Sequence, residues 1–259
     1  MNEWEHAEFS HQRLHVYDKI LAFMSIALAT VDGWDKRHAI VDHLPRAVES
    51  MITNLAEGCR AYGLEEKRLA VDYATASALE CAGCVDVGQA KGLAFSTAPP
   101  ECKRRVTEIV RMLIGLRNSW QENIVRESRA EYRTAADFDS DGSDLHHEQL
   151  DVYREALEFV KWFSQQGLAD RLPNRLFRAI DMRATTMVLN VAEGNGRFAA
   201  LDRRKFLETA DRATVKAAAY LDVCKQSGYL AESEAAEQIS RLARVSSMVA
   251  GMRVASSRR

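Results

Sequence analysis

The chain has 259 residues, of which 47% are hydrophobic and 28% are charged, and its formal net charge is −2. This composition is typical of a globular protein with two ordinary domains, and its near neutrality excludes a nucleic-acid binder that is basic over its whole surface. We expect a cytoplasmic protein, because no apolar run reaches the roughly 18 residues of a membrane span and the acidic N-terminus lacks the pattern of a signal peptide.

Apolar residues recur at spacings of three and four along most of the chain, which is the period of amphipathic α-helices. The predicted helices are 11–30, 36–58, 64–91 and 99–125, and then 147–166, 172–194, 200–227 and 232–254. We expect Gly58 and Gly194 to end the second helix of each set in a left-handed cap, and Gly92 and Gly228 to end the third. Four amphipathic helices with short connections predict an antiparallel four-helix bundle.

Two motifs occur twice, each time 136 residues apart. His11-Gln-Arg-Leu14-His-Val16-Tyr17 returns as His147-Glu-Gln-Leu150-Asp-Val152-Tyr153, and Asn54-Leu-Ala56-Glu57-Gly58 returns as Asn190-Val-Ala192-Glu193-Gly194. About a fifth of all positions are identical between 11–116 and 147–252 without a gap. We therefore predict an all-α protein of two tandem antiparallel four-helix bundles, 11–125 and 147–254, joined by an acidic linker at 126–146.

The linker contains a calcium-loop pattern. Asp137, Asp139, Asp141, Gly142, Ser143 and Glu148 satisfy the D-x-D-x-D-G-x5-E spacing of an EF-hand. Against this interpretation, Asp144 stands where EF-hands usually carry an aliphatic residue, and no partner hand is visible. A flexible acidic linker is the reading that we favour, with calcium binding as the alternative.

Basic residues gather after the second helix in each copy. Phosphate groups bind well at such places, because free N–H groups at a helix start act together with cationic side chains. The alternative is a solvated helix start. The candidate nucleic-acid-binding residues are Arg60, Lys67 and Arg68 in the first copy and Arg197, Arg203, Arg204 and Lys205 in the second.

The shared Asn and Glu residues lie three apart, so that each pair, Asn54 with Glu57 and Asn190 with Glu193, lies on one helix face. We interpret them, with Gly58 and Gly194, as a structural or interface motif: a polar contact between helices or subunits, or a terminal turn that packs on the glycine. A catalytic role would need a second converging carboxylate.

The five cysteines are odd in number, which argues against a disulfide framework. Cys81-Ala-Gly-Cys84 has the spacing of a zinc ligand pair, but no second pair exists, so buried thiols are expected. No phosphate loop, catalytic triad or metalloprotease pattern occurs. We therefore expect no enzymatic activity and no cofactor.

Three motifs together resemble the four helix bundle protein family: L-x-V-Y in the first helix, N-x-A-E-G in the second and M-x-x-G in the fourth, Met112 to Gly115 and Met248 to Gly251. This family includes proteins of 23S ribosomal RNA intervening sequences and the accessory variability determinant of diversity-generating retroelements. The tandem arrangement departs from the family, whose members are usually one bundle long. A second departure is Arg212-Ala-Thr-Val-Lys216, which lacks the family's acidic residue in the third helix.

The resemblance implies a non-enzymatic protein that works by binding. In this family, the retroelement accessory protein looks like a pentamer with the shape of a barrel. It binds a reverse transcriptase and nucleic acid through a basic surface. By this resemblance we expect a homo-oligomer whose partners are a reverse transcriptase and RNA or DNA. The alternative is a scaffold or regulatory module with protein partners alone, made calcium-sensitive by its linker.

Overall fold

The computed structural model describes residues 10–127, 145–196 and 200–256, and every regular element in these ranges is helical. The expected all-α class is therefore confirmed. The elements of the first half are η1 (Ser10–Arg13), α1 (His15–Asp32), α2 (Ile40–Arg60), α3 (Leu64–Ala90) and α4 (Pro99–Glu127). Those of the second half are η2 (His146–Gln149), α5 (Asp151–Gln165), α6 (Leu168–Arg171), α7 (Asn174–Asn195), α8 (Ala200–Gln226) and α9 (Glu232–Ser256).

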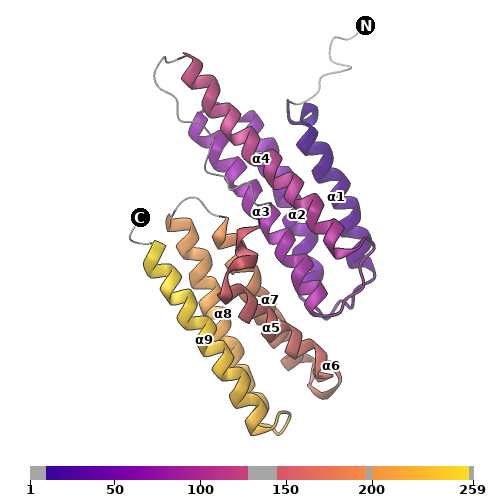
Figure 1. The fold of residues 1–259 in the computed structure, drawn as a ribbon. Coiled ribbons are helices and arrows are strands. Elements are labelled where there is room, and N and C mark those ends of the chain that lie inside the picture. The colour runs from indigo at the N-terminus through magenta and orange to yellow at the C-terminus, as the bar shows by residue number, and fades with distance from the viewer. Residues whose placement is uncertain (1–9, 128–144, 197–199, 257–259) are drawn as a thin grey trace.

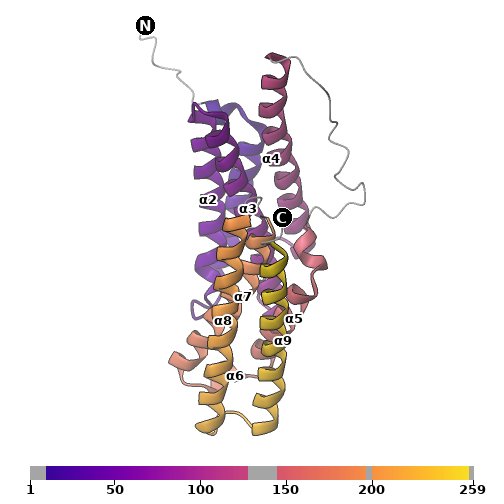
Figure 2. The same ribbon diagram turned by 90° about the vertical axis from the view of Figure 1, so that its left-hand side faces the viewer.

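In each half, four long helices contact one another in a closed cycle. In the first, α1 and α3 each contact both α2 and α4, and in the second, α5 and α8 each contact both α7 and α9. The two halves are staggered along a similar helix direction (Figures 1 and 2). Among the described helices, none combines the length and the apolar character that crossing a bilayer requires.

Helix α3 joins the halves, because it contacts α5 and α7 as well as its own neighbours α2 and α4. Small residues make this double contact possible, since they let helix backbones approach closely. A Cβ atom at Gly83 would lie 3.1 Å from Leu189 Cδ2 and 3.4 Å from Ala192 Cβ, both on α7. The buried small residues of α3 include Ala74, Ala76, Ala78, Ala82 and Gly83. Helix α3 is thus buried nearly all round.

The opening helices differ from their predicted bounds in the same way in both halves. The predicted helices 11–30 and 147–166 are each interrupted near the start, because the backbone at Leu14 and Leu150 is extended. A short 3-10 turn precedes each break. A histidine of each turn packs against a tyrosine of the helix that follows. The ring centroids of His11 and Tyr17 lie 4.9 Å apart and those of His147 and Tyr153 lie 4.8 Å apart, both in an edge-on arrangement.

The prediction that Gly58 and Gly194 form left-handed caps is wrong. Both lie inside helices, which continue to Arg60 and Asn195, and neither has a positive φ. Their role is close packing: a Cβ atom would lie 3.1 Å from Ala70 Cβ at Gly58 and 3.1 Å from Phe206 Cβ at Gly194. In both halves the glycine therefore permits the close approach of the second helix to the third.

The left-handed turns lie one helix later. Gly92 and Gly228, 136 residues apart, have φ values of 68° and 75° and follow the ends of α3 and α8, as predicted. Gly167, with a φ of 64°, adds a third such turn before the short α6, which the sequence did not predict.

Candidate functional site

Two cation–aromatic pairs lie where α2 ends and α3 begins. The guanidinium carbon of Arg60 lies 5.3 Å from the ring centroid of Tyr62, and Nζ of Lys67 lies 5.8 Å from that of Trp120 on α4. Tyr62 is 85% exposed, whereas tyrosines are on average partly buried. We call Arg60, Tyr62, Lys67 and Trp120 the aromatic corner. Of the predicted nucleic-acid-binding residues, it brings Arg60 and Lys67 together with exposed aromatic surface.

Three of the other predicted basic residues pair with nearby carboxylates. Arg68 lies 3.2 Å from Glu65. On α8, Arg204 lies 2.9 Å from Glu208 and Lys205 lies 3.1 Å from Asp202. The remaining predicted residues of the second half are Arg203, which also has an interaction partner, and Arg197, which lies outside the described residues. The second set of cations thus contributes less free positive charge than the sequence suggested.

The shared asparagines bond within their own helices. Nδ2 of Asn54 donates to the carbonyl of Ser50 at 2.7 Å, and Nδ2 of Asn190 donates to the carbonyl of Thr186 at 2.8 Å. Glu57 is exposed on α2, whereas Glu193 is half-buried on α7 and has a partner. These two hydrogen bonds stay within one helix, whereas the packing at Gly58 and Gly194 brings two helices together.

The first polar cluster between the halves surrounds Asp181 of α7, which is fully buried. Its carboxylate accepts hydrogen bonds from Nζ of Lys91 at 2.5 Å and from the N–H of Ala39 at 2.8 Å, and it lies 3.0 Å from Nδ1 of His38. Lys91 also donates to Oγ1 of Thr185 at 3.0 Å. The cluster therefore ties the end of α3 and the start of α2 to α7.

Burial and pairing act in opposite directions on the ionisation of this cluster. Burial lowers the pKa of Lys91 in spite of Asp181. Burial alone would raise the pKa of Asp181, but the positive charge of Lys91 and the hydrogen bonds from His38 and Ala39 outweigh it, so that this pKa is lowered. The carboxylate consequently stays charged as the partner of Lys91.

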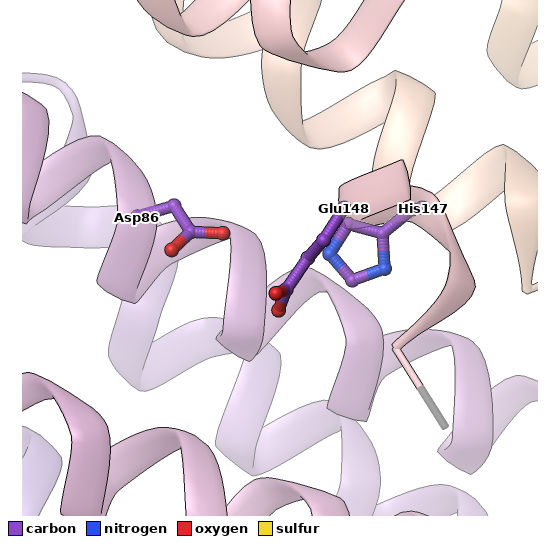
Figure 3. A group of neighbouring side chains, drawn as sticks. All are labelled: Asp86, His147 and Glu148. Atoms are coloured by element: carbon purple, nitrogen blue, oxygen red, sulfur yellow. The ribbon is translucent and has the colours of Figure 1, made fainter. Parts of the chain in front are cut away.

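The second cluster contains Asp86 of α3, Lys103 of α4, His147 and Glu148 of η2, and Tyr153 of α5. Nζ of Lys103 lies 2.6 Å from Asp86 Oδ1 and 2.7 Å from Glu148 Oε1. The hydroxyl of Tyr153 donates to Asp86 Oδ2 at 2.8 Å. Figure 3 shows the side chains of Asp86, His147 and Glu148 turned toward a common point. We call these three residues the junction triad.

His147 is the unusual member of the triad. It is 0% exposed, and neither ring nitrogen has a hydrogen-bond partner among the described residues. Burial, with smaller contributions from the charges of Lys103 and His146, lowers its pKa to about 3. The ring is therefore neutral near pH 7, with a nitrogen lone pair available.

The predicted calcium loop is only partly within the described residues. Asp137, Asp139, Asp141 and Ser143 lie outside them. Glu148, the expected bidentate ligand, is paired with Lys103. Cys81 and Cys84 are buried as expected, and burial raises the pKa of both thiols well above the ordinary value, which makes them unreactive.

Residues 148–251 match the model of the 23S rRNA-intervening sequence protein family. The matched range runs from η2 through most of α9 and so covers nearly all of the second half. Neither the curated proteins nor the solved structures include a match to the chain.

Proposed function

We propose that this protein is a non-enzymatic, oligomeric scaffold that binds single-stranded nucleic acid at the aromatic corner. The observation that carries the proposal is the exposed ring of Tyr62 beneath the guanidinium group of Arg60. The second half, which does not contain the aromatic corner, matches the 23S rRNA-intervening sequence protein family, whose name refers to ribosomal RNA. By resemblance to the retroelement accessory protein, a reverse transcriptase is the protein partner that we propose.

The corner offers both kinds of contact that an unpaired strand needs. Bases of any sequence stack on exposed aromatic rings and on guanidinium planes, with about 1–3 kcal/mol per base. Phosphates would be attracted by Lys67 and by the start of α3, which no side chain caps, although Glu65 and Glu66 in its first turn oppose this attraction. Arg68 can exchange its exposed partner Glu65 for a phosphate at little cost, because surface ion pairs contribute about 0–1 kcal/mol.

Tyr62→Ala should weaken the binding of a short single-stranded RNA by about 1–3 kcal/mol, roughly 5- to 150-fold in Kd, because it removes one stacking platform. Fluorescence anisotropy at low salt measures this change. Tyr62→Phe is the matched control and should retain nearly full affinity, since its ring stacks equally well. Arg60→Ala should also weaken binding, whereas Arg154→Ala, on the exposed surface of α5, should not.

Equal affinity of the Tyr62→Ala variant and the unchanged protein for RNA would contradict the placement of the binding site at the aromatic corner. If the protein forms an oligomer but retains neither RNA nor DNA at low salt, a scaffold with protein partners alone is the better description. Phosphate contacts weaken steeply with salt, so a salt series separates these outcomes from nonspecific charge attraction.

Assembly is proposed from the contact between the two halves. The face of α3 that docks on α5 and α7 includes Ala76, Leu79, Gly83 and Val87, all buried. The residues 136 positions later on α8 are Arg212, Val215, Ala219 and Val223, and all four are exposed. We call them the α8 stripe. Val215 is 58% exposed and Val223 is 44% exposed, so the equivalent of a buried surface lies open.

The complementary surface is also open. Leu189, Ala192 and Tyr153 surround Gly83 in the contact between the halves. Their equivalents in the first half are Thr53, Ala56 and Tyr17, all at least partly exposed. A second copy of this chain could therefore dock α1 and α2 on the α8 stripe as α5 and α7 dock on α3. Repeated head-to-tail contacts of this kind produce rings or filaments.

Val215→Glu should shift the protein from an oligomer toward a monomer, because it places a charge in the centre of the proposed contact. Light scattering coupled to size exclusion measures the mass. Val254→Glu, at an exposed position on α9, is the control and should leave the mass unchanged. A monomeric unchanged protein, or an oligomer indifferent to Val215→Glu, would contradict this surface.

A further inference from the structure

We propose that the junction triad, Asp86, His147 and Glu148, is a binding site for a divalent transition-metal ion of the zinc class. One ligand atom from each residue lies within 4.8 Å of those from the other two. Asp86 belongs to α3, whereas His147 and Glu148 belong to η2, so the ligands come from both halves of the chain (Figure 3). The site depends neither on nucleic-acid binding nor on oligomer formation.

The buried imidazole of His147 points to a ligand. Buried polar atoms are nearly always hydrogen-bonded, and a bound ion is one of the explanations for an exception. Both ring nitrogens of His147 lack a hydrogen-bond partner among the described residues, although the side chain is fully buried. The edge-on contact with Tyr153 holds the ring in place beside the two carboxylates. A neutral imidazole held in this way is ready to donate its lone pair to a metal ion.

Lys103 shows that the two carboxylates already form a cation site. Its ammonium group lies within 2.7 Å of an oxygen of Asp86 and within 2.7 Å of an oxygen of Glu148. The lysine side chain is partly exposed and long enough to turn toward solvent. A divalent ion in place of the ammonium group would bring two positive charges instead of one, and a ring nitrogen of His147 would also coordinate it. Lys103 and the metal ion are therefore competitors for one place.

The donor set selects the class of metal. One imidazole nitrogen and two carboxylates suit zinc and neighbouring transition metals, whereas calcium prefers six to eight oxygen ligands. This site is thus different from the calcium loop that the linker sequence suggests, although both would use Glu148. Because its ligands come from α3 and η2, a bound ion would tie the two halves together at their junction.

The test is titration of the full chain, after removal of metals by a chelator, with Zn²⁺ in a calorimeter and with Co²⁺ followed by visible absorption. We expect one ion per chain and Co²⁺ bands without a thiolate charge-transfer band, which excludes the cysteines. His147→Ala and Glu148→Gln should each weaken binding at least tenfold, on the order of the loss seen when groups that support a metal site are removed. Lys103→Met should tighten it by removing the competitor.

The partly exposed pair of His43 with Glu80, 3.4 Å apart, provides the control: His43→Ala should leave the affinity unchanged. Glu148 is partly exposed, so Glu148→Gln can be tested even if the buried His147→Ala variant does not fold. Failure of both the unchanged protein and Lys103→Met to bind either ion would overturn the proposal. Binding that is indifferent to Glu148→Gln would also overturn it.

Discussion

Replacing Asp181 with alanine should lower the free energy of unfolding by about 3–5 kcal/mol, because it leaves a buried ammonium group without its counter-charge. Lys91 is fully buried in its side chain and has Asp181 as its ionic partner. The N–H of Ala39 would lose its acceptor as well. Urea denaturation at pH 7 measures the change, which is a large part of the stability of an ordinary domain.

A second pair of variants separates the charge effect from a general disturbance of the junction. The double variant Lys91→Met with Asp181→Leu should be less destabilised than Asp181→Ala, because no unpaired charge remains buried. Asp222→Ala removes the carboxylate of an exposed pair with Lys225 and should change stability by less than about 1 kcal/mol. An Asp181→Ala protein as stable as this control would contradict the importance of the buried pair.

The difference between the unchanged protein and Asp181→Ala should also depend on pH. The pKa of Asp181 is lowered in the folded state from its ordinary value of 3.8. Its contribution to stability is therefore fully present above pH 3.8 and is lost as the pH falls through the folded-state pKa. As the pH falls below the folded-state pKa of Asp181, the free energies of unfolding of the unchanged protein and of Asp181→Ala should become more similar. Urea denaturation at a series of acidic pH values would show this.

The sequence predicts the helices well, because helical periodicity is a local property. Helices α3 and α8 begin at the same point of the repeat, Leu64 and Ala200, and end at Ala90 and Gln226. Their surroundings are not equivalent. Helix α3 is buried on nearly all sides and shows little amphipathic pattern, because the second half covers the face that α8 leaves open. Ala76 and Gly83 are smaller than Arg212 and Ala219, the residues at the equivalent positions of α8, and this difference in the sequence indicates the burial of α3.

The cluster around Asp181 could not be predicted from residues that both copies share. Asp181 corresponds to Pro45 in the first copy, and Lys91 corresponds to Ser227 in the second. Asp181 and Lys91 each make their contact only where one copy meets the other. A search for residues that are identical in both copies therefore does not identify them. The pairing of Lys91 with Asp181 spans 90 residues of chain and depends on the docking of α3 against α7.

At the aromatic corner, the sequence identified the cations but not the rings. Arg60, Lys67 and Arg68 stand out because they cluster after a helix, whereas Tyr62 and Trp120 lie 58 positions apart and are typical of core residues. Only the fold shows that Tyr62 is exposed and that Trp120 on α4 lies beside Lys67. Spatial proximity between separate helices is the information that periodicity does not contain.

Gly83→Leu should destabilise the contact between the halves, with a loss of about 1–3 kcal/mol in the free energy of unfolding, because the added side chain has no room between α3 and α7. The Cβ atom alone would approach Leu189 Cδ2 to 3.1 Å and the hydroxyl oxygen of Tyr153 to 3.6 Å. Urea denaturation measures the loss. Hydrogen exchange should at the same time become faster in α5 and α7, since both contact α3.

The repeat itself supplies the control for this prediction. Ala219→Leu introduces the same side chain at the equivalent position of α8, which is exposed within one chain. Because Ala219 belongs to the α8 stripe, both variants are compared in the Val215→Glu background, in which we expect a monomer, and there Ala219→Leu should change stability by no more than about 0.5 kcal/mol. If both variants lose the same stability, the effect belongs to the helix and not to the junction. If only Gly83→Leu is destabilised, the close approach at Gly83 is what allows one half of this chain to dock on the other.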